Sequence, residues 1–424
     1  MFALPETAAV LAALLPLIAV INAAPSPQSA GSNNEIPNQF IITLKPGTNM
    51  AQHLNYVRGI HAVSFARHRK RDSENFAGIT NRYNVSDFQA YAGHFDPVVM
   101  KQIRASKDVE DIEPDKIYTT MSRVVQYNPP IGLNLISHRG LSQEHKGYAY
   151  DSSSGKKTYA YVVDTGIDIH HTEFEGRAIH GHNAVKSSQN DEDNVGHGTH
   201  VAGTIGGKTY GIAKSTNLIS IKVFDAIQGS LSEVMAGVDF AIKDIIHFKR
   251  QKKAVVNMSL GGPYSLSFNK MVDRGFKYDV LMVIAAGNAD RDASEVSPSS
   301  AAGAITVGAT DMYRVRAKFS NYGTNLTLFA PGVDVLSAWP SPPAPPGHLP
   351  VPSNATRSLS GTSMAAPHIA GMAAYLMGIK RFGSAKTLRE SMVRLSTKKV
   401  VGDIKGSPNA FAYNNGGSQV GIWG

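Results

Sequence analysis

The stretch "YAYVVD" (159–164) decides the fold class, because a short apolar run suited to a buried strand ends in a carboxylate. Strands that are apolar on both faces and alternate with helices are typical of a mostly parallel sheet covered on each side. We therefore expect an α/β fold. Further strand candidates are "NLISIKVF" (217–224), "AVVNMSL" (254–260), "LMVIAAG" (281–287) and "AITVGAT" (304–310). Helix candidates are 197–207, 231–249, 267–277, 363–377 and 384–396.

A smaller unit precedes this region. Residues 39–119 show strand and helix patterns in the order β-α-β-α-β, which predicts an α+β domain of roughly 80 residues. The first residues contain an apolar stretch from Ala8 to Ile21, which is too short for a membrane span and is typical of a secretory signal peptide. We expect a signal peptide at 1–23, the α+β domain at 38–120 and the large domain at 124–424.

Composition limits the possible chemistry. The 424 residues contain no cysteine, which excludes disulfides and thiolate chemistry. The formal net charge of +9 raises nucleic-acid binding as an alternative, but the basic residues are scattered apart from "RHRKR" (67–71) and "KRQKK" (249–253). The first run is interpreted as an exposed loop rather than a processing signal, and the second as a solvated helix end. We expect a secreted, soluble monomer without a nucleic-acid or membrane partner.

Three short motifs contain the residue types that acyl transfer needs. Serine is a poor nucleophile unless an imidazole takes its proton, and the imidazole needs a carboxylate to orient it. We interpret Ser363 as the nucleophile, His197 as general base and then acid, and Asp164 as the residue that orients His197. Because the base must be unprotonated, we expect a neutral-to-alkaline pH optimum. The motifs are "VVDTGID" (162–168), "GHGTHVAGTIGG" (196–207) and "SGTSMAAPH" (360–368).

Each motif alone also has a simpler interpretation. Asp164 can be a turn residue, and Ser363 can be a helix cap. His197 and His200 have a spacing that suits metal ligands, although no obvious third ligand accompanies them. The glycines of 196–207 can hold a phosphate, but they match neither a P-loop nor a dinucleotide-binding loop. A silent binding module and a metal-dependent hydrolase therefore remain as alternatives.

Taken together, the motifs resemble those of subtilisin-like serine peptidases, the subtilase family. The region from about Asn128 to Asn409 is similar to the proteinase K branch found in fungi through "DTGID", "HGTHVAGT", "NMSLGG", "AAGN" and "SGTSMAAPH". The order Asp, His, Ser is also that of subtilisin. The unit at 39–119 resembles the inhibitory propeptide of the family. The resemblance implies a secreted serine endopeptidase, made as a zymogen that cleaves itself.

The resemblance also implies roles for other residues. Asn288 would offer a side-chain N–H to the oxyanion, beside the backbone N–H of Ser363. Two backbone edges would bind an extended peptide with broad specificity, and small residues would wall a pocket for an apolar or aromatic side chain before the cut. The implied substrate-binding residues are Ser259, Leu260, Gly261, Gly229, Ser230, Leu231, Ala285, Ala286 and Gly287.

Ions, processing and glycosylation complete the expectations. The carboxylate ligand of the family's strong calcium site falls on Thr327, and a hydroxyl is a poor substitute, so we expect no cofactor and leave calcium elsewhere open. The propeptide, which is expected to act as an intramolecular inhibitor, should be cut around 121–123, and its tail near 118–121 should lie in the substrate cleft. Asn257 falls in a predicted buried strand. The sequons expected to carry glycans are Asn84, Asn325 and Asn354, the last in a proline-rich insert (340–357).

Overall fold

The chain divides into two compact units, Met1–Thr120 and Met121–Gly424. The computed structural model describes residues 35–68, 76–116, 123–141, 147–188, 190–341 and 353–418. The predicted signal peptide, the tail at 118–121 and most of the insert at 340–357 lie outside these residues, so the domain limits stay predictions. None of the helices within the described residues is both long and apolar enough to cross a membrane.

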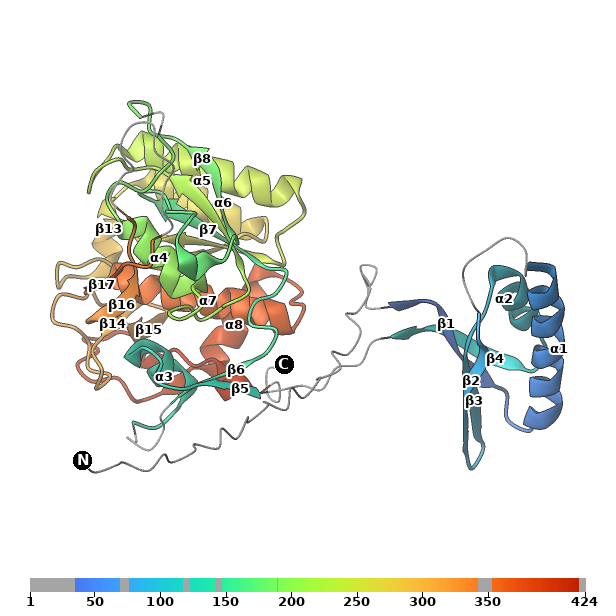
Figure 1. Ribbon diagram of the computed structural model, residues 1–424. Coiled ribbons are helices and arrows are strands. Elements are labelled where there is room, and N and C mark those ends of the chain that lie inside the picture. The colour runs from blue at the N-terminus through green and yellow to red at the C-terminus, as the bar shows by residue number, and fades with distance from the viewer. Residues whose placement is uncertain are drawn as a thin grey trace, which may run out of the picture. The chain divides into compact units, whose positions relative to one another are not determined.

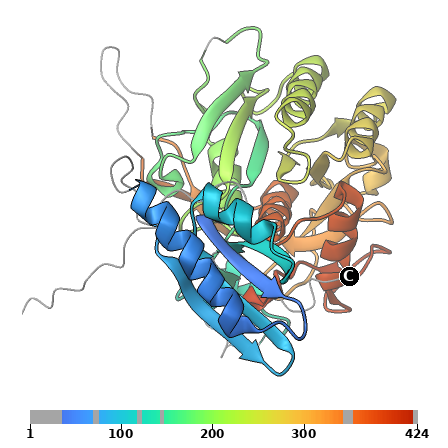
Figure 2. The same ribbon diagram turned by 90° about the vertical axis from the view of Figure 1, so that its right-hand side faces the viewer.

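The N-terminal unit is an antiparallel sheet with two helices over one face (Figures 1 and 2). Its elements are β1 (Glu35–Leu44), α1 (Met50–His68), β2 (Gly78–Val85), β3 (Phe88–His94), α2 (Pro97–Arg104) and β4 (Val109–Lys116). The strand order is β2-β3-β1-β4. Asp96 caps α2, because its carboxylate accepts the backbone N–H groups of Val98 and Val99 at 2.7 and 3.0 Å. The predicted α+β pattern is therefore present in this unit.

The second unit is built on a sheet that is parallel except at one edge (Figure 1). Within the described residues its strand order is β18-β19-β15-β14-β12-β10-β7-β9-β8. Neighbouring strands are parallel in every pair except β18 with β19. The predicted α/β class is confirmed. The strands are β7 (Tyr159–Asp164), β8 (Ala178–Asn183), β9 (Asn217–Lys222), β10 (Ala254–Met258), β12 (Leu281–Ala285), β14 (Ile305–Thr310), β15 (Leu328–Pro331), β18 (Thr397–Lys398) and β19 (Ala410–Phe411).

Helices cover both faces of this sheet, as the apolar strands require. On one face, α4 (His197–Gly206) and α7 (Thr362–Ile379) share a core with α8 (Ala385–Leu395) and α3 (Ile131–Ser137). On the other face, α5 (Leu231–His247) and α6 (Leu266–Lys277) form a second core. Helix α7 is apolar on every side and almost wholly buried, which makes it the central helix of the unit.

Short elements complete the unit. Strand β5 (Arg123–Gln126) pairs with β6 (Tyr148–Asp151), β11 (Gly262–Pro263) with β13 (Val296–Ser297), and β16 (Val335–Ala338) with β17 (Thr356–Leu359). The 3-10 helices are η1 (Thr172–Phe174), η2 (Ala293–Glu295) and η3 (Asn415–Gly417).

The strand order places a crevice beside β7. The chain runs from β7 to β8 and β9 on one side, and then returns to pair β10 with the other side of β7. In such sheets, ligands bind outside the carboxyl ends of the strands, where the order reverses. Asp164 ends β7 and Ser259 follows β10, so both stand at this point.

A buried arginine holds the C-terminal end of α3. The guanidinium of Arg314 donates to the carbonyls of Leu135, His138 and Arg139 at 3.1, 2.6 and 2.6 Å. Its side chain is fully buried, and this burial lowers its pKa. Arg314 therefore satisfies carbonyl groups that the helix end leaves without partners.

We expect Arg314→Met to lower the free energy of unfolding by about 2–4 kcal/mol, because three carbonyls that are buried or partly buried lose their donor. Because the sequence predicts a peptidase, the measurement is chemical denaturation of protein pretreated with a fluorophosphonate, so that self-digestion does not distort it. Arg381→Met is the matched control, since Arg381 is exposed. Equal stability of the two variants would contradict the role given to Arg314.

Candidate active site

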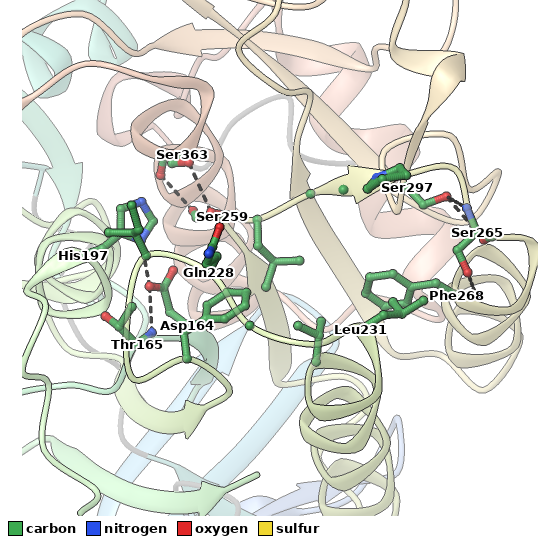
Figure 3. A pocket seen from close by; sticks show the side chains of 18 of the residues that line it. Asp164, Thr165, His197, Gln228, Leu231, Ser259, Ser265, Phe268, Ser297 and Ser363 are labelled. Atoms are coloured by element: carbon green, nitrogen blue, oxygen red, sulfur yellow. Dashed lines mark hydrogen bonds and ion pairs between the residues drawn. The ribbon is translucent and has the colours of Figure 1, made fainter. Parts of the chain in front are cut away.

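An aspartate and a histidine form the centre of the site. Asp164 at the end of β7 is 1% exposed, and its Oδ1 lies 2.7 Å from Nδ1 of His197, the first residue of α4 (Figure 3). The same oxygen accepts the backbone N–H of Thr165 at 2.8 Å. The imidazole is thus held through Nδ1, and its Nε2 remains available for proton transfer.

A second buried carboxylate joins the end of β7 to the start of α4. Asp193 accepts the hydroxyl of Thr165 at 2.7 Å, and the N–H and hydroxyl of Thr199 at 2.8 and 2.7 Å. Thr165 in turn accepts the N–H of Gly198 at 2.9 Å. A Cβ on Gly198 would lie 2.1 Å from the carbonyl oxygen of Gly166, so only glycine allows this approach. Asp193 was not predicted, although an acid four residues before His197 was a usable signal.

The charge around His197 favours its protonated form. Burial lowers the pKa of His197, but the charge of Asp164, the hydrogen bond to it and the charge of Asp193 outweigh burial and raise the pKa above its usual value. A raised pKa means that the neutral base predominates only at higher pH.

Ser363 lies in the first turn of α7 and is tied to the end of β10. Pro367 has no N–H, so it cannot bond the carbonyl of Ser363 four residues earlier. The hydroxyl of Ser259 donates to that carbonyl at 2.8 Å instead, and the hydroxyl of Ser363 donates to the carbonyl of Ser259 at 3.1 Å (Figure 3). Between described residues no hydrogen bond joins Ser363 to His197 directly. Both side chains line the same cavity.

Asn288 lies beside the first turn of α7. Its Oδ1 accepts the backbone N–H and the hydroxyl of Thr362, both at 2.8 Å. These donors fix which end of the carboxamide is oxygen, so the N–H₂ group lies at the opposite end. The backbone N–H of Gly287 donates to the Thr362 hydroxyl at 3.0 Å, which joins the loop after β12 to α7.

The cavity at this site has a volume of about 570 Å³ and a largely apolar wall. The structure brings eight of the predicted site residues to it, and the residues concerned are Asp164, His197, Ser363, Ser259, Leu260, Gly261, Gly229 and Leu231. Ser230 is not among them, because its hydroxyl caps α5 by accepting the N–H of Glu233 at 3.2 Å.

The predicted pocket wall does not line this cavity either. Ala285 and Ala286 are buried in the core, and neither they nor Gly287 belongs to the lining. Their contact with substrate stays a prediction. Five further apolar residues of the lining were not predicted, although Val234 follows Leu231 by one helical turn. These residues are Phe224, Ile227, Val234, Tyr264 and Phe268.

His200, the second histidine of the metal-ligand alternative, bonds backbone carbonyls through Nε2. His200 Nε2 donates to the carbonyls of Val335 and Arg357 at 2.9 and 3.0 Å, so this nitrogen has no free lone pair. Burial lowers the pKa of His200 to about 4, which keeps it neutral. Among the described residues, no group of three or more His, Cys, Asp or Glu could hold a metal ion.

The remaining predicted positions can be placed in the structure. Thr327 is buried, and its hydroxyl accepts the N–H of Thr306 at 3.3 Å. Asn84 and Asn354 are exposed, Asn325 is half-buried, and Asn257 is buried in β10. Calcium binding and glycosylation stay predictions.

Known proteins resemble both units of the chain. Residues 155–413 match the family model described as "Subtilase family", and residues 39–121 match "Peptidase inhibitor I9". "Alkaline protease 1" of Aspergillus clavatus is 45% identical over 98% of this chain and 99% of that protein. "Alkaline proteinase" of Hapsidospora chrysogena is 42% identical over 96% of this chain and 98% of that protein. A solved cold adapted subtilisin-like serine proteinase is 34% identical, with a TM-score of 0.61, over 68% of this chain and 98% of its own.

Proposed function

Because the chain belongs to the subtilase family of serine endopeptidases and carries an inhibitory propeptide, we propose that Asp164, His197 and Ser363 are its catalytic triad. The observation that carries this proposal is the 2.7 Å contact between Asp164 and His197 in the cavity that Ser363 also lines. The Ser363 hydroxyl bonds the Ser259 carbonyl in this structure, so the proposal requires it to change partner to the imidazole. Contacts between nucleophile and base are often loose before substrate binds.

The proposed reaction follows from the positions of these groups. His197 Nε2 takes the proton from Ser363 Oγ as that oxygen attacks the scissile carbonyl, and it later gives the proton to the leaving amine. Asp164 stabilises the charged imidazole through Nδ1. The backbone N–H of Ser363 at the start of α7 and the side-chain N–H₂ of Asn288 would receive the negative oxygen.

Labelling tests the assignment of the nucleophile. A fluorophosphonate probe should modify the mature enzyme once, and peptide mass spectrometry should locate the adduct on Ser363. Loss of activity on labelling, together with unchanged activity in a chelator, would separate the serine mechanism from the metal-dependent alternative. An active enzyme that resists the probe would contradict the proposal.

The finer properties of the enzyme are also proposals. We infer that a signal peptide directs secretion, that the enzyme cuts itself around 121–123, and that it acts as a monomer on many proteins. Specificity should be broad, since backbone edges bind any peptide. We also infer a preference for an apolar or aromatic residue before the cut. The apolar wall of the cavity supports a second preference for a large apolar side chain of the substrate.

Leu231→Asp is expected to lower kcat/KM roughly tenfold for peptides whose large apolar side chain enters the cavity, because a carboxylate replaces part of its apolar wall. Peptides with a small residue at that position should be affected much less. The measurement is cleavage-site profiling on a peptide library.

Leu266→Asp is the matched control for this change. Leu231 and Leu266 are both exposed, and each is the first residue of a helix, α5 and α6 respectively. A carboxylate at either position therefore meets the positive end of a helix dipole. Of the two, only Leu231 lines the cavity. Identical library profiles for the two variants would show that the cavity does not select substrate side chains.

A further inference from the structure

A buried asparagine lies under the loop that carries Asn288. Asn321 is 1% exposed, and its Oδ1 accepts the backbone N–H groups of Ala289 and Arg291 at 3.0 and 3.2 Å. Its Nδ2 donates to the carbonyl of Ala286 at 2.9 Å. One side chain therefore binds the loop on both sides of Asn288.

Backbone contacts bring the two segments close together. The N–H of Asn321 donates to the carbonyl of Gly287, and the N–H of Asp290 donates to the carbonyl of Phe319, both at 2.9 Å. A Cβ on Gly287 would lie 2.4 Å from Nδ2 of Asn321, and Gly287 has a φ of 105°. The loop therefore follows the surface of Asn321, and a glycine is needed where the two meet.

The position of Asn288 depends on this support. Hydrogen bonds from Thr362 orient the carboxamide of Asn288, while its backbone lies in the loop that Asn321 binds. An oxyanion donor must lie about 2.7–3.1 Å from the developing negative oxygen, so a small shift of the loop removes much of its effect.

We propose that Asn321 is a positioning residue for the oxyanion site. Its three side-chain hydrogen bonds fix the backbone from Ala286 to Arg291 and so fix where the N–H₂ group of Asn288 lies when the oxyanion forms. Asn321 contacts no reacting atom. The inference rests on the proposed role of Asn288 as an oxyanion donor.

A double-mutant cycle between the two asparagines tests the inference. Asn288→Ala should lower kcat by about 10²–10³, the loss known for the corresponding donor of subtilisin. Asn321→Ala should lower kcat roughly tenfold with little change in KM, because only transition-state stabilisation is reduced. In the Asn288→Ala background, Asn321→Ala should lower kcat less than about twofold, because the group that it positions is gone.

The enzyme for this cycle is produced from the full chain, and active molecules are counted by fluorophosphonate titration, so that misfolded protein does not enter kcat. Binding of a peptide aldehyde, which forms an oxyanion on Ser363, should weaken in Asn321→Ala by about the same factor as kcat. Asn321→Asp keeps both acceptor contacts and should recover part of the loss.

Asn414→Ala is the matched control for loss of a buried asparagine. Asn414 is fully buried, donates to the carbonyl of Ala149 at 2.9 Å and accepts the N–H of Gly416 at 2.9 Å. It should lower the melting temperature without changing kcat of the titrated enzyme.

Three outcomes would overturn the inference. An unchanged kcat in Asn321→Ala, or an equal loss in both backgrounds, would reject it while leaving Asn288 as an oxyanion donor. An unchanged kcat in Asn288→Ala would instead reject the proposed role of Asn288, and the inference would fail with it.

Discussion

Ser363→Ala is expected to lower kcat by about 10⁶, a loss known for the nucleophile of subtilisin rather than derived from this molecule. Without the hydroxyl, no acyl-enzyme can form, and Asp164 and His197 have no group to activate. The residual rate should come from binding and the oxyanion donors alone. Peptide hydrolysis is measured on protein that has been freed of other proteases.

The same variant should also fail to process itself. If the cut around 121–123 is made by the chain's own active site, Ser363→Ala should accumulate with its propeptide attached, and mass spectrometry of the purified chain would detect this. Ser358→Ala is the control, because Ser358 is an exposed serine in β17, shortly before the motif. Full peptidase activity in Ser363→Ala would end the assignment of the nucleophile.

Asp164→Asn is expected to lower kcat by a factor of about 10⁴, the size of the loss known when a triad aspartate becomes an amide. The asparagine can donate to Nδ1 of His197, which favours the wrong tautomer of the imidazole. It also removes the charge that stabilises the imidazolium during proton transfer. Asp164 is buried and lies 2.7 Å from the ring, so solvent cannot replace its carboxylate.

The pH profile of Asp164→Asn provides a second readout. In the parent enzyme, Asp164 helps to hold the pKa of His197 above its usual value, so activity should rise with pH as the imidazole loses its proton. Loss of the carboxylate lowers that pKa, and the rising limb of kcat/KM should move to lower pH. Asp191→Asn changes an exposed aspartate in the loop between β8 and α4 and should leave the rising limb of kcat/KM where it is. A limb that does not move in Asp164→Asn would show that another group titrates.

The central strands and helices were predictable because their sequences repeat simple patterns. Strand β7 matches its predicted range, and the predicted helix from 363 lies within α7. Four other strands of the sheet were not predicted, and β8 and β15 show why. β8 is an edge strand with the polar sequence "AIHGHN", and β15 has only four residues and ends in proline. Neither carries the long apolar run that identifies a buried strand.

The residues of the site that stand in sequence motifs were predictable, and the other residues around them were not. Asp164, His197 and Ser363 stand in motifs that can be recognised along the chain, and folding brings them to one cavity. Phe224 and Phe268 reach the same cavity from separate segments, and nothing in their neighbours marks them. Asn321 was missed for the same reason, because its role depends on which loop packs against it. Local pattern cannot supply contacts of this kind.

The proposed triad comes from distant parts of the chain, so peptidase activity requires most of the second unit to have folded. Asp164 ends β7, the first strand of the large sheet in chain order, whereas Ser363 lies in α7, which follows seven of its nine strands. A partly folded molecule has some of these residues in place but no complete active site. Molecules that are all still incomplete therefore cannot cleave one another.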